Sequence, residues 1–197
     1  MDKFEELKEK VIKGLGFKKE EEIAEEEIKS FPYLDPKELL DILGLTIKSD
    51  EQNKLTTFLC QLSAFTEDSQ FNISFNAPSS TGKSYIPLEI AKLFPKSSDL
   101  EEEKDVIELG YCSPKAFFHD HSRYDSKTKL IIVNLERKII IFLDQPHFQL
   151  LHHLRPILSH DKKEILVKIT DKSKGGGQRT KNILIRGFPA VIFCSAG

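Results

Sequence analysis

The chain has 197 residues, of which 39% are hydrophobic and 30% are charged, and its formal net charge is −2. This length suits one α/β domain with a substantial core, and the composition is that of a soluble globular protein. No apolar run approaches the roughly 18 residues of a membrane span, and the acidic, lysine-rich start is not the pattern of a signal peptide. The three cysteines are far apart and lack metal-site spacing, which favours reduced thiols in a cytoplasmic protein.

Residues 1–34 are dominated by Glu and Lys and predict a charged helical arm or a linker. Asp35, as N-cap, and Pro36 begin a short predicted helix that ends at Gly44. We therefore expect an arm over residues 1–34 and a core over residues 35–197. Asp50 is expected to cap a longer helix whose buried face has helical spacing and comprises Leu55, Phe58, Leu59, Leu62 and Phe65.

The motif around which the chain is organised lies between residues 71 and 95. Residues 71–76 alternate apolar and polar side chains, which predicts a strand. Residues 77–84 follow as a loop ending in Gly-Lys-Ser, and a helical pattern then continues to Pro95. Strand, loop, Gly-Lys-Ser and helix in this order are typical of the phosphate-binding loop of P-loop NTPases.

In such a loop, successive backbone N–H groups point at a phosphate. Lys83 would reach the β and γ oxygens of ATP, and Ser84 would hold Mg²⁺. The expected nucleotide-binding residues are Ala77, Pro78, Ser79, Ser80, Thr81, Gly82, Lys83 and Ser84. Ala77 stands where the motif usually has its first glycine and would cost about 1 kcal/mol if that position needed a positive φ. A chance Gly-Lys-Ser at a helix start is the alternative interpretation.

Residues 105–110 predict a short strand, and Ser113 is expected to cap a short helix over residues 114–118. Imidazoles and carboxylates then crowd together at His119, Asp120, His121 and Asp125. A metal site is one interpretation of this segment. Because no second cluster has ligand spacing, a solvated loop is favoured.

Residues 129–144 predict a β-hairpin in which residues 130–133 pair with residues 138–143. The second strand is a continuous apolar run of the kind buried in parallel sheets, and Asp144 follows it. Downstream of a phosphate-binding loop this is the Walker B arrangement, in which the carboxylate meets the Mg²⁺ shell. Gln145 stands where hydrolysing members usually have Glu. This argues against fast hydrolysis, although a glutamine can orient water.

Residues 146–158 predict a helix with leucines and isoleucines on its inner side, at Leu150, Leu151, Leu154, Ile157 and Leu158. A second hairpin follows, with strands over residues 165–170 and 181–186. Its glycine-rich tip carries Lys172, Lys174 and Arg179, which suit contact with a nucleic-acid backbone. A solvated turn is the alternative.

Residues 189–195 predict a last buried strand, and Ser195 at its end is placed to contact a γ-phosphate or the attacking water. The sequence stops directly after this strand. We therefore expect these residues to belong to a longer protein with a lid domain that is missing here.

Taken together, these motifs resemble an AAA+-type core. A hairpin before the last strand resembles the group that includes superfamily III viral helicases and MCM helicases. Residues 50–195 look most like the ATPase module of phage and mobile-element primase–helicase replication proteins. This likeness is carried by the 50–62 helix, the loop at 78–84, and the segments at 154–159 and 186–189. It implies an α/β fold with a mainly parallel sheet flanked by helices, ATP and Mg²⁺ binding, oligomeric rings and action on DNA.

The expected function is that of an ATPase motor domain in DNA replication, in which Lys83, Asp144, Gln145 and Ser195 act on the nucleotide. One rival is a nucleotide-dependent binding or regulatory module with little hydrolysis, for which Gln145 is the best support. A small-molecule P-loop kinase is the other. The kinase is disfavoured because the sequence has no arginine-rich lid segment and the basic hairpin would have no use.

Overall fold

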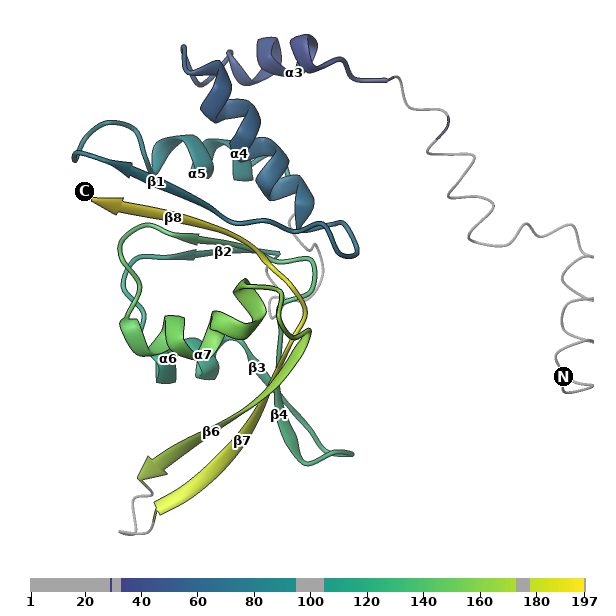
Figure 1. Cartoon of the computed structure of the whole chain (residues 1–197), viewed down its shortest axis with the longest axis vertical. Helices are drawn as coiled ribbons and strands as arrows, with labels where there is room; N and C mark the ends of the chain where they lie inside the picture. The colour runs from purple at the N-terminus through teal and green to yellow at the C-terminus, as the bar shows by residue number, and fades with distance from the viewer. Residues whose placement is uncertain (1–28, 30–32, 95–104, 173–177, 197) are drawn as a thin grey trace, which may run out of the picture. The chain divides into compact units, whose positions relative to one another are not determined.

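The computed structural model describes residues 29, 33–94, 105–172 and 178–196 (Figure 1). The chain divides into two compact units, residues 1–41 and 42–197, with the division inside helix α3 (Pro36–Leu43). Most of the expected N-terminal arm lies outside the described residues, so a boundary between residues 34 and 35 stays a prediction. Both sheets, and every described helix after α3, belong to the second unit.

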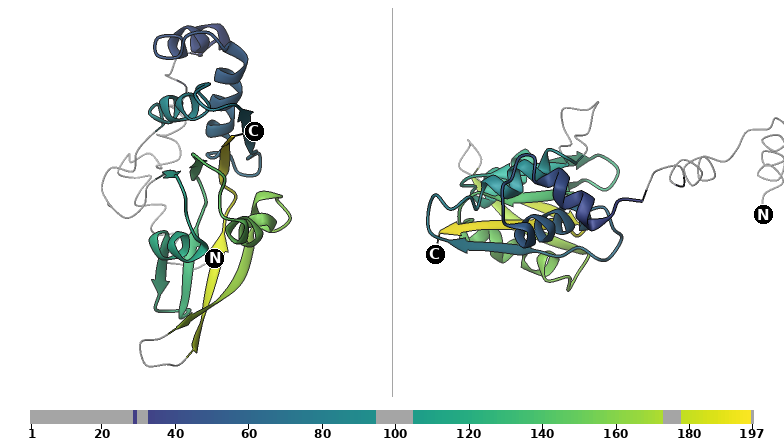
Figure 2. Two further views of the ribbon diagram at one scale, coloured as in Figure 1. Left: turned by 90° about the vertical axis from the view of Figure 1, so that its left-hand side faces the viewer. Right: turned by 90° about the horizontal axis from the view of Figure 1, so that it is seen from above.

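A four-stranded parallel sheet carries the candidate site. Its strands are β1 (Ile73–Ala77), β2 (Val106–Leu109), β5 (Ile139–Phe142) and β8 (Ala190–Ala196), in the order β1-β8-β5-β2. All three pairings are parallel, and β1 and β8 lie side by side in Figure 2. Every residue of β5 is buried, as its continuous apolar run predicts for an inner strand. The expected α/β class, with a parallel sheet flanked by helices, is confirmed.

Alternate residues of the inner strands face opposite layers of helices. Ile140 and Phe142 of β5 join a core cluster with Leu150 and Leu154 of α7 (Phe148–Leu158), beside α6 (Pro114–Asp120). Helices α4 (Glu51–Ser63) and α5 (Tyr85–Ala91) pack against each other, and α4 contacts β8. The helix expected over residues 146–158 is confirmed as α7, whose buried residues all come from the expected set.

A second, mixed sheet has the order β3-β4-β7-β6. It comprises β3 (Ser122–Asp125), β4 (Leu130–Asn134), β6 (Glu164–Lys172) and β7 (Gln178–Arg186). The antiparallel β6–β7 ladder confirms the second predicted hairpin, which extends away from α7 in Figure 1. Val133, Ile183 and Ile185 of this sheet belong to the same core cluster as β5 and α7, so one core joins the two sheets.

The predicted hairpin over residues 129–144 is wrong. β4 pairs antiparallel with β3 and parallel with β7, whereas β5 pairs with β2 and β8 in the other sheet. The actual hairpin is β3–β4, which also corrects the expected loop at residues 119–125: these residues form the end of α6 and then β3. The apolar runs of β4 and β5 are adjacent in the sequence, which suggested that they pair with each other. Instead, β4 pairs with β7 and β5 pairs with β8.

The predicted buried face of α4 is wrong at two of its five positions. Leu55, Phe58 and Phe65 are partly buried, and the rings of Phe58 and Phe65 lie 5.6 and 5.8 Å from that of Phe94. Leu59 and Leu62 are 45% and 43% exposed, whereas the buried residues of this helix are Lys54, Thr57, Cys60, Gln61 and Ser63. Backbone carbonyls accept from two of the buried donors: Lys54 Nζ donates to Ile47 O (3.2 Å), and Gln61 Nε2 donates to Pro87 O (2.8 Å). Gln61 Oε1 is buried without a hydrogen-bond partner among the described residues. Bonds to backbone carbonyls allow a polar face to be buried, which an apolar periodicity cannot reveal.

Two of the three N-caps expected from the sequence are confirmed. At α3, Asp35 Oδ1 accepts from Lys37 N (2.8 Å), and at α6, Ser113 Oγ accepts from Ala116 N (3.3 Å), as expected of N-caps. Asp50 precedes α4 but has φ 64° and makes no side-chain cap bond; its carboxylate accepts from Asn53 Nδ2 instead. Within the described part of the chain, no helix is both long and apolar enough to cross a bilayer.

Candidate functional site

Three parallel strands bring polar residues to one edge of the sheet. Asn76 of β1 pairs with Ser195 of β8, and Phe142 of β5 pairs with Phe193 of β8. Asp144 follows Phe142 by two residues, as Ser195 follows Phe193. The carboxyl ends of parallel strands meet at the same edge, where ligands bind in open α/β sheets.

These residues line one cleft with a volume of about 380 Å³. Asp144, Gln145 and Ser195 lie in its wall, as expected of residues that act together, and so does Asn76. Pro146 and Leu151 of the following segment close another side. Sequence reasoning missed Asn76, although its position at the end of a strand, directly before the loop, was a usable signal.

The acidic residue of the cleft is accessible. Asp144 and Gln145 are both exposed, and Asp144 Oδ1 accepts a hydrogen bond from Gln145 N at 2.7 Å. This bond fixes the carboxylate beside the start of the segment that leads into α7. An exposed carboxylate at this edge is available to a cation or to a water molecule.

The predicted phosphate-binding loop connects β1 to α5. Lys83 Nζ donates to Ala77 O (2.6 Å) and to Pro78 O (2.7 Å), so the side chain lies back over the start of its own loop. Gly82 has φ +90° and Ser80 has φ +64°. The glycine is therefore required by the backbone at Gly82, because side chains disfavour positive φ.

Ala77 is the last residue of β1 and is not among the residues with positive φ. The strain that its substitution for glycine could have caused is therefore absent from this conformation. The departure from the motif at Ala77 has no backbone cost here.

A buried thiol connects the loop to the neighbouring strand. Cys194, which precedes Ser195 on β8, donates through Sγ to Lys83 O at 3.4 Å. Burial raises the pKa of the Cys194 thiol, while a hydrogen bond with the Ser84 side chain and the charge of Lys83 oppose this rise. The loop and the polar end of β8 are thus in direct contact, although Lys83 and Ser84 do not themselves line the cleft.

The donors at this edge suit a hard cation. A hydroxyl from Ser84 and a carboxylate from Asp144 are oxygen ligands, which Mg²⁺ prefers, and Mg²⁺ takes its other ligands from phosphates and water. The described residues contain no group of three or more His, Cys, Asp or Glu that could hold a metal by themselves. Ser84 and Asp144 thus supply the type of oxygen donor that Mg²⁺ takes beside a phosphate. Residues 119–125, which the structure describes, form no such metal-holding group.

The expected DNA-contacting residues are not at this edge. Lys172 and Arg179 belong to the β6–β7 ladder of the other sheet, where their Cα partners are Gln178 and Asp171. Lys174 lies outside the described residues. The cleft is therefore at the edge of the parallel sheet, whereas the β6–β7 ladder belongs to the other sheet.

No protein-family model matches the chain, and no curated protein matches it.

Proposed function

We propose that the chain binds ATP with Mg²⁺ at the carboxyl edge of its parallel sheet and acts as the ATPase domain of a DNA-replication protein. The observation that carries the proposal is the meeting of β1, β8 and β5 at one edge. There Asp144, Gln145, Ser195 and Asn76 line one cleft, and the Gly-Lys-Ser loop follows directly after Asn76 and Ala77.

Each residue has a role that its chemistry permits. Lys83, whose ammonium is now held by two loop carbonyls, would exchange them for phosphate oxygens. Ser84 and Asp144 would hold Mg²⁺, which neutralises phosphate charge when bound. Ser195 and Asn76 would orient the terminal phosphate or a water molecule by hydrogen bonds. Gln145, beside Asp144, would orient the attacking water.

A second candidate function, a nucleotide-dependent binding module, is favoured by Gln145 itself. A neutral amide cannot accept a proton from water as a carboxylate can, so it supplies position without a general base. On this alternative the domain holds ATP and changes partner affinity with little turnover. The two functions share the nucleotide site and differ in the rate of hydrolysis.

The test of the nucleotide site is ATP binding by Lys83→Ala. We expect calorimetry with Mg²⁺ to detect ATP binding by the natural chain and none by the variant, because the variant loses its charge contact with the phosphates. Lys127→Ala is the matched control, since Lys127 is exposed and lies on the turn between β3 and β4. Thermal unfolding of both variants verifies that they fold, and equal ATP affinity in folded Lys83→Ala would contradict the proposal.

A further inference from the structure

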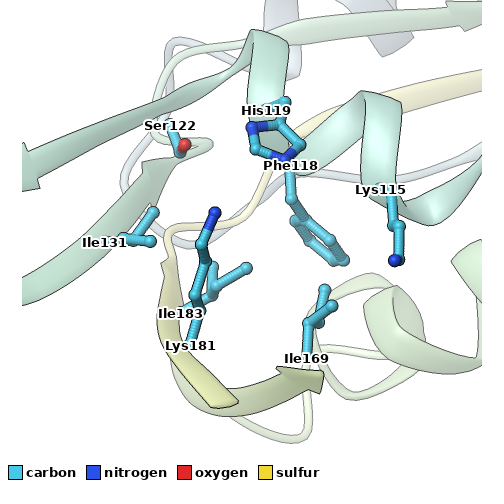
Figure 3. Close-up of a pocket in the computed structure, with 8 residues that line it drawn as sticks. All are labelled: Lys115, Phe118, His119, Ser122, Ile131, Ile169, Lys181 and Ile183. Carbon is cyan, nitrogen blue, oxygen red and sulfur yellow. The ribbon is translucent and has the colours of Figure 1, made fainter. Parts of the chain in front are cut away.

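The inner side of the β6–β7 ladder forms a groove with α6 and α7 that the nucleotide site does not use. It consists of two hollows that share Lys115 and Ile169 and therefore meet. We call it the hairpin groove. The first hollow, shown in Figure 3, is apolar inside, with walls from Phe118, Ile131, Ile169 and Ile183.

Polar groups surround the apolar hollow. In Figure 3 the amine of Lys181 points to the side on which His119 and Ser122 lie, and Lys115 lies beyond the Phe118 ring. An apolar interior with cationic and hydroxyl groups around it suits a ligand that has a flat apolar body and an anionic attachment.

The second hollow is wider and more polar than the first, with a volume of about 370 Å³. Beyond the two shared residues it is lined by the N-terminal end of α6, the first half of α7 and β6, through Ser113, Pro114, His147, Gln149, His153 and Lys168. Burial and the neighbouring His152 lower the pKa of His153, so this imidazole is neutral near pH 7 and can still donate a hydrogen bond.

The charged side chains that line the hairpin groove are lysines. Lys115, Lys168 and Lys181 line it, and none of its lining residues, all within the described part of the chain, is Asp or Glu. The chain as a whole has a net charge of −2, whereas the charged residues of this lining are positive. Positive residues of this kind attract polyanions.

The apolar hollow has the size of a single ring. Its volume is about 60 Å³. Since one water molecule needs roughly 10–15 Å³ by the same measure, the hollow has room for about four to six such positions. That room suits a pyrimidine ring better than a fused purine, and an acidic peptide has no ring on its charged residues to fill it.

We propose that the hairpin groove binds single-stranded nucleic acid, with one pyrimidine base in the apolar hollow and the adjoining phosphates along Lys181, Lys115 and Lys168. Single strands are bound in this way wherever cations follow the backbone and apolar or aromatic side chains take the bases. The inference rests on the proposed function in one respect, the choice of nucleic acid as the partner. It places the nucleic-acid strand along the inner side of the β6–β7 hairpin as well as at the hairpin tip.

The test fills the hollow. Ile169→Trp puts a large ring into it, whereas Leu166→Trp is the matched control because Leu166 is on the same strand, is 54% exposed and lines neither hollow. We expect oligothymidylate to bind the full chain and Leu166→Trp equally, and to bind Ile169→Trp roughly 5- to 150-fold more weakly, the range measured for losing one stacked base. Equal affinity of all three proteins would overturn the proposal.

Three further ligands distinguish the contribution of the base to binding from the contribution of the phosphate charge. An oligonucleotide with the same number of phosphates but no bases should bind the full chain about as weakly as oligothymidylate binds Ile169→Trp. Polyglutamate of equal charge should bind more weakly than oligothymidylate, and equal binding would make the groove a plain polyanion surface and overturn the proposal. Oligouridylate compared with oligothymidylate distinguishes RNA from DNA.

A direct readout locates the base. Ultraviolet crosslinking of an oligonucleotide containing 5-iodouracil should attach it to the peptide that carries Phe118 and His119, and crosslinks confined to residues 172–179 would contradict the groove. ATP binding measured on the same proteins reports on the nucleotide site separately. Loss of the crosslink with ATP binding intact therefore refutes the groove alone, and absent ATP binding refutes the proposed function alone.

Discussion

At Gly187 the backbone takes φ +86° between β7 and β8, and a Cβ atom there would lie 2.3 Å from Glu136 Cγ and 2.5 Å from Glu136 N. Both the positive φ and the backbone contact oppose any side chain. We expect Gly187→Ala to lower the free energy of unfolding by roughly 1–3 kcal/mol, the usual cost of overpacking. Gly110→Ala is the control, since a Cβ there meets nothing within 4 Å. Urea unfolding measures both, and equal midpoints would show that the turn relaxes freely.

Gln145 separates the two candidate functions. If it orients water, Gln145→Glu should keep or raise the rate of ATP hydrolysis, because a carboxylate orients water and also accepts a proton. Phosphate release with and without single-stranded DNA is the measurement, and Asp144→Asn, which removes the cation ligand, is the inactive control. Stable ATP binding with no turnover by the natural chain under any DNA condition would favour the binding module.

The tip of the β6–β7 hairpin remains a predicted contact with nucleic acid. Changing Lys172, Lys174 and Arg179 to Ala should weaken binding of single-stranded DNA and flatten its dependence on log salt by about two, since each phosphate contact contributes roughly 0.7. ATP binding should persist, because Lys172 and Arg179 belong to the other sheet. Fluorescence anisotropy at several salt concentrations is the measurement.

The matched control for the hairpin tip changes three exposed lysines elsewhere in the chain: Lys37, Lys48 and Lys127. Equal slopes in the two triple variants would leave the tip a solvated turn.

Helix α4 shows how an element can bury its polar face. Thr57 Oγ1 donates to Asn53 O and Ser63 Oγ donates to Cys60 O, so these hydroxyls are satisfied within the helix itself. The helix can then pack closely while Leu59 and Leu62 stay exposed. Its orientation is set by small and hydrogen-bonded side chains that fit against α5 and β8.

Across the whole molecule, all three cysteines are buried free thiols. Burial raises the pKa of Cys60 from 9.0 to about 12. The unfolded thiol therefore ionises at lower pH than the folded one, so the stabilisation is complete below pH 9 and is lost as the pH rises toward 12. Between the two pKa values, each rise of one pH unit lowers the free energy of unfolding by about 1.4 kcal/mol.

We therefore expect the free energy of unfolding to fall between pH 8 and pH 10, as measured in urea, and to fall less in Cys60→Ala. Alkylation of the native protein at pH 8 should be limited by the rate of unfolding at all three thiols. Rapid labelling of Cys60 in the folded state would contradict its burial.

Local pattern in the sequence was enough to predict the strands before and after the site, helix α7, the caps at Asp35 and Ser113, and the β6–β7 hairpin. Periodicity and capping chemistry depend on neighbours in the chain, which is why these predictions succeeded. It also indicated that Asp144 follows a strand and that Ser195 lies at the end of one, and the parallel sheet then placed both with Asn76 along one cleft. Tertiary structure alone decided that β4 pairs with β7 and β5 with β8, because apolar strands fit many partners and only the shared core selects among them. Asn72 is a further example: it donates to Leu158 O and accepts from Val191 N, 86 and 119 residues away, and no local pattern contains such contacts.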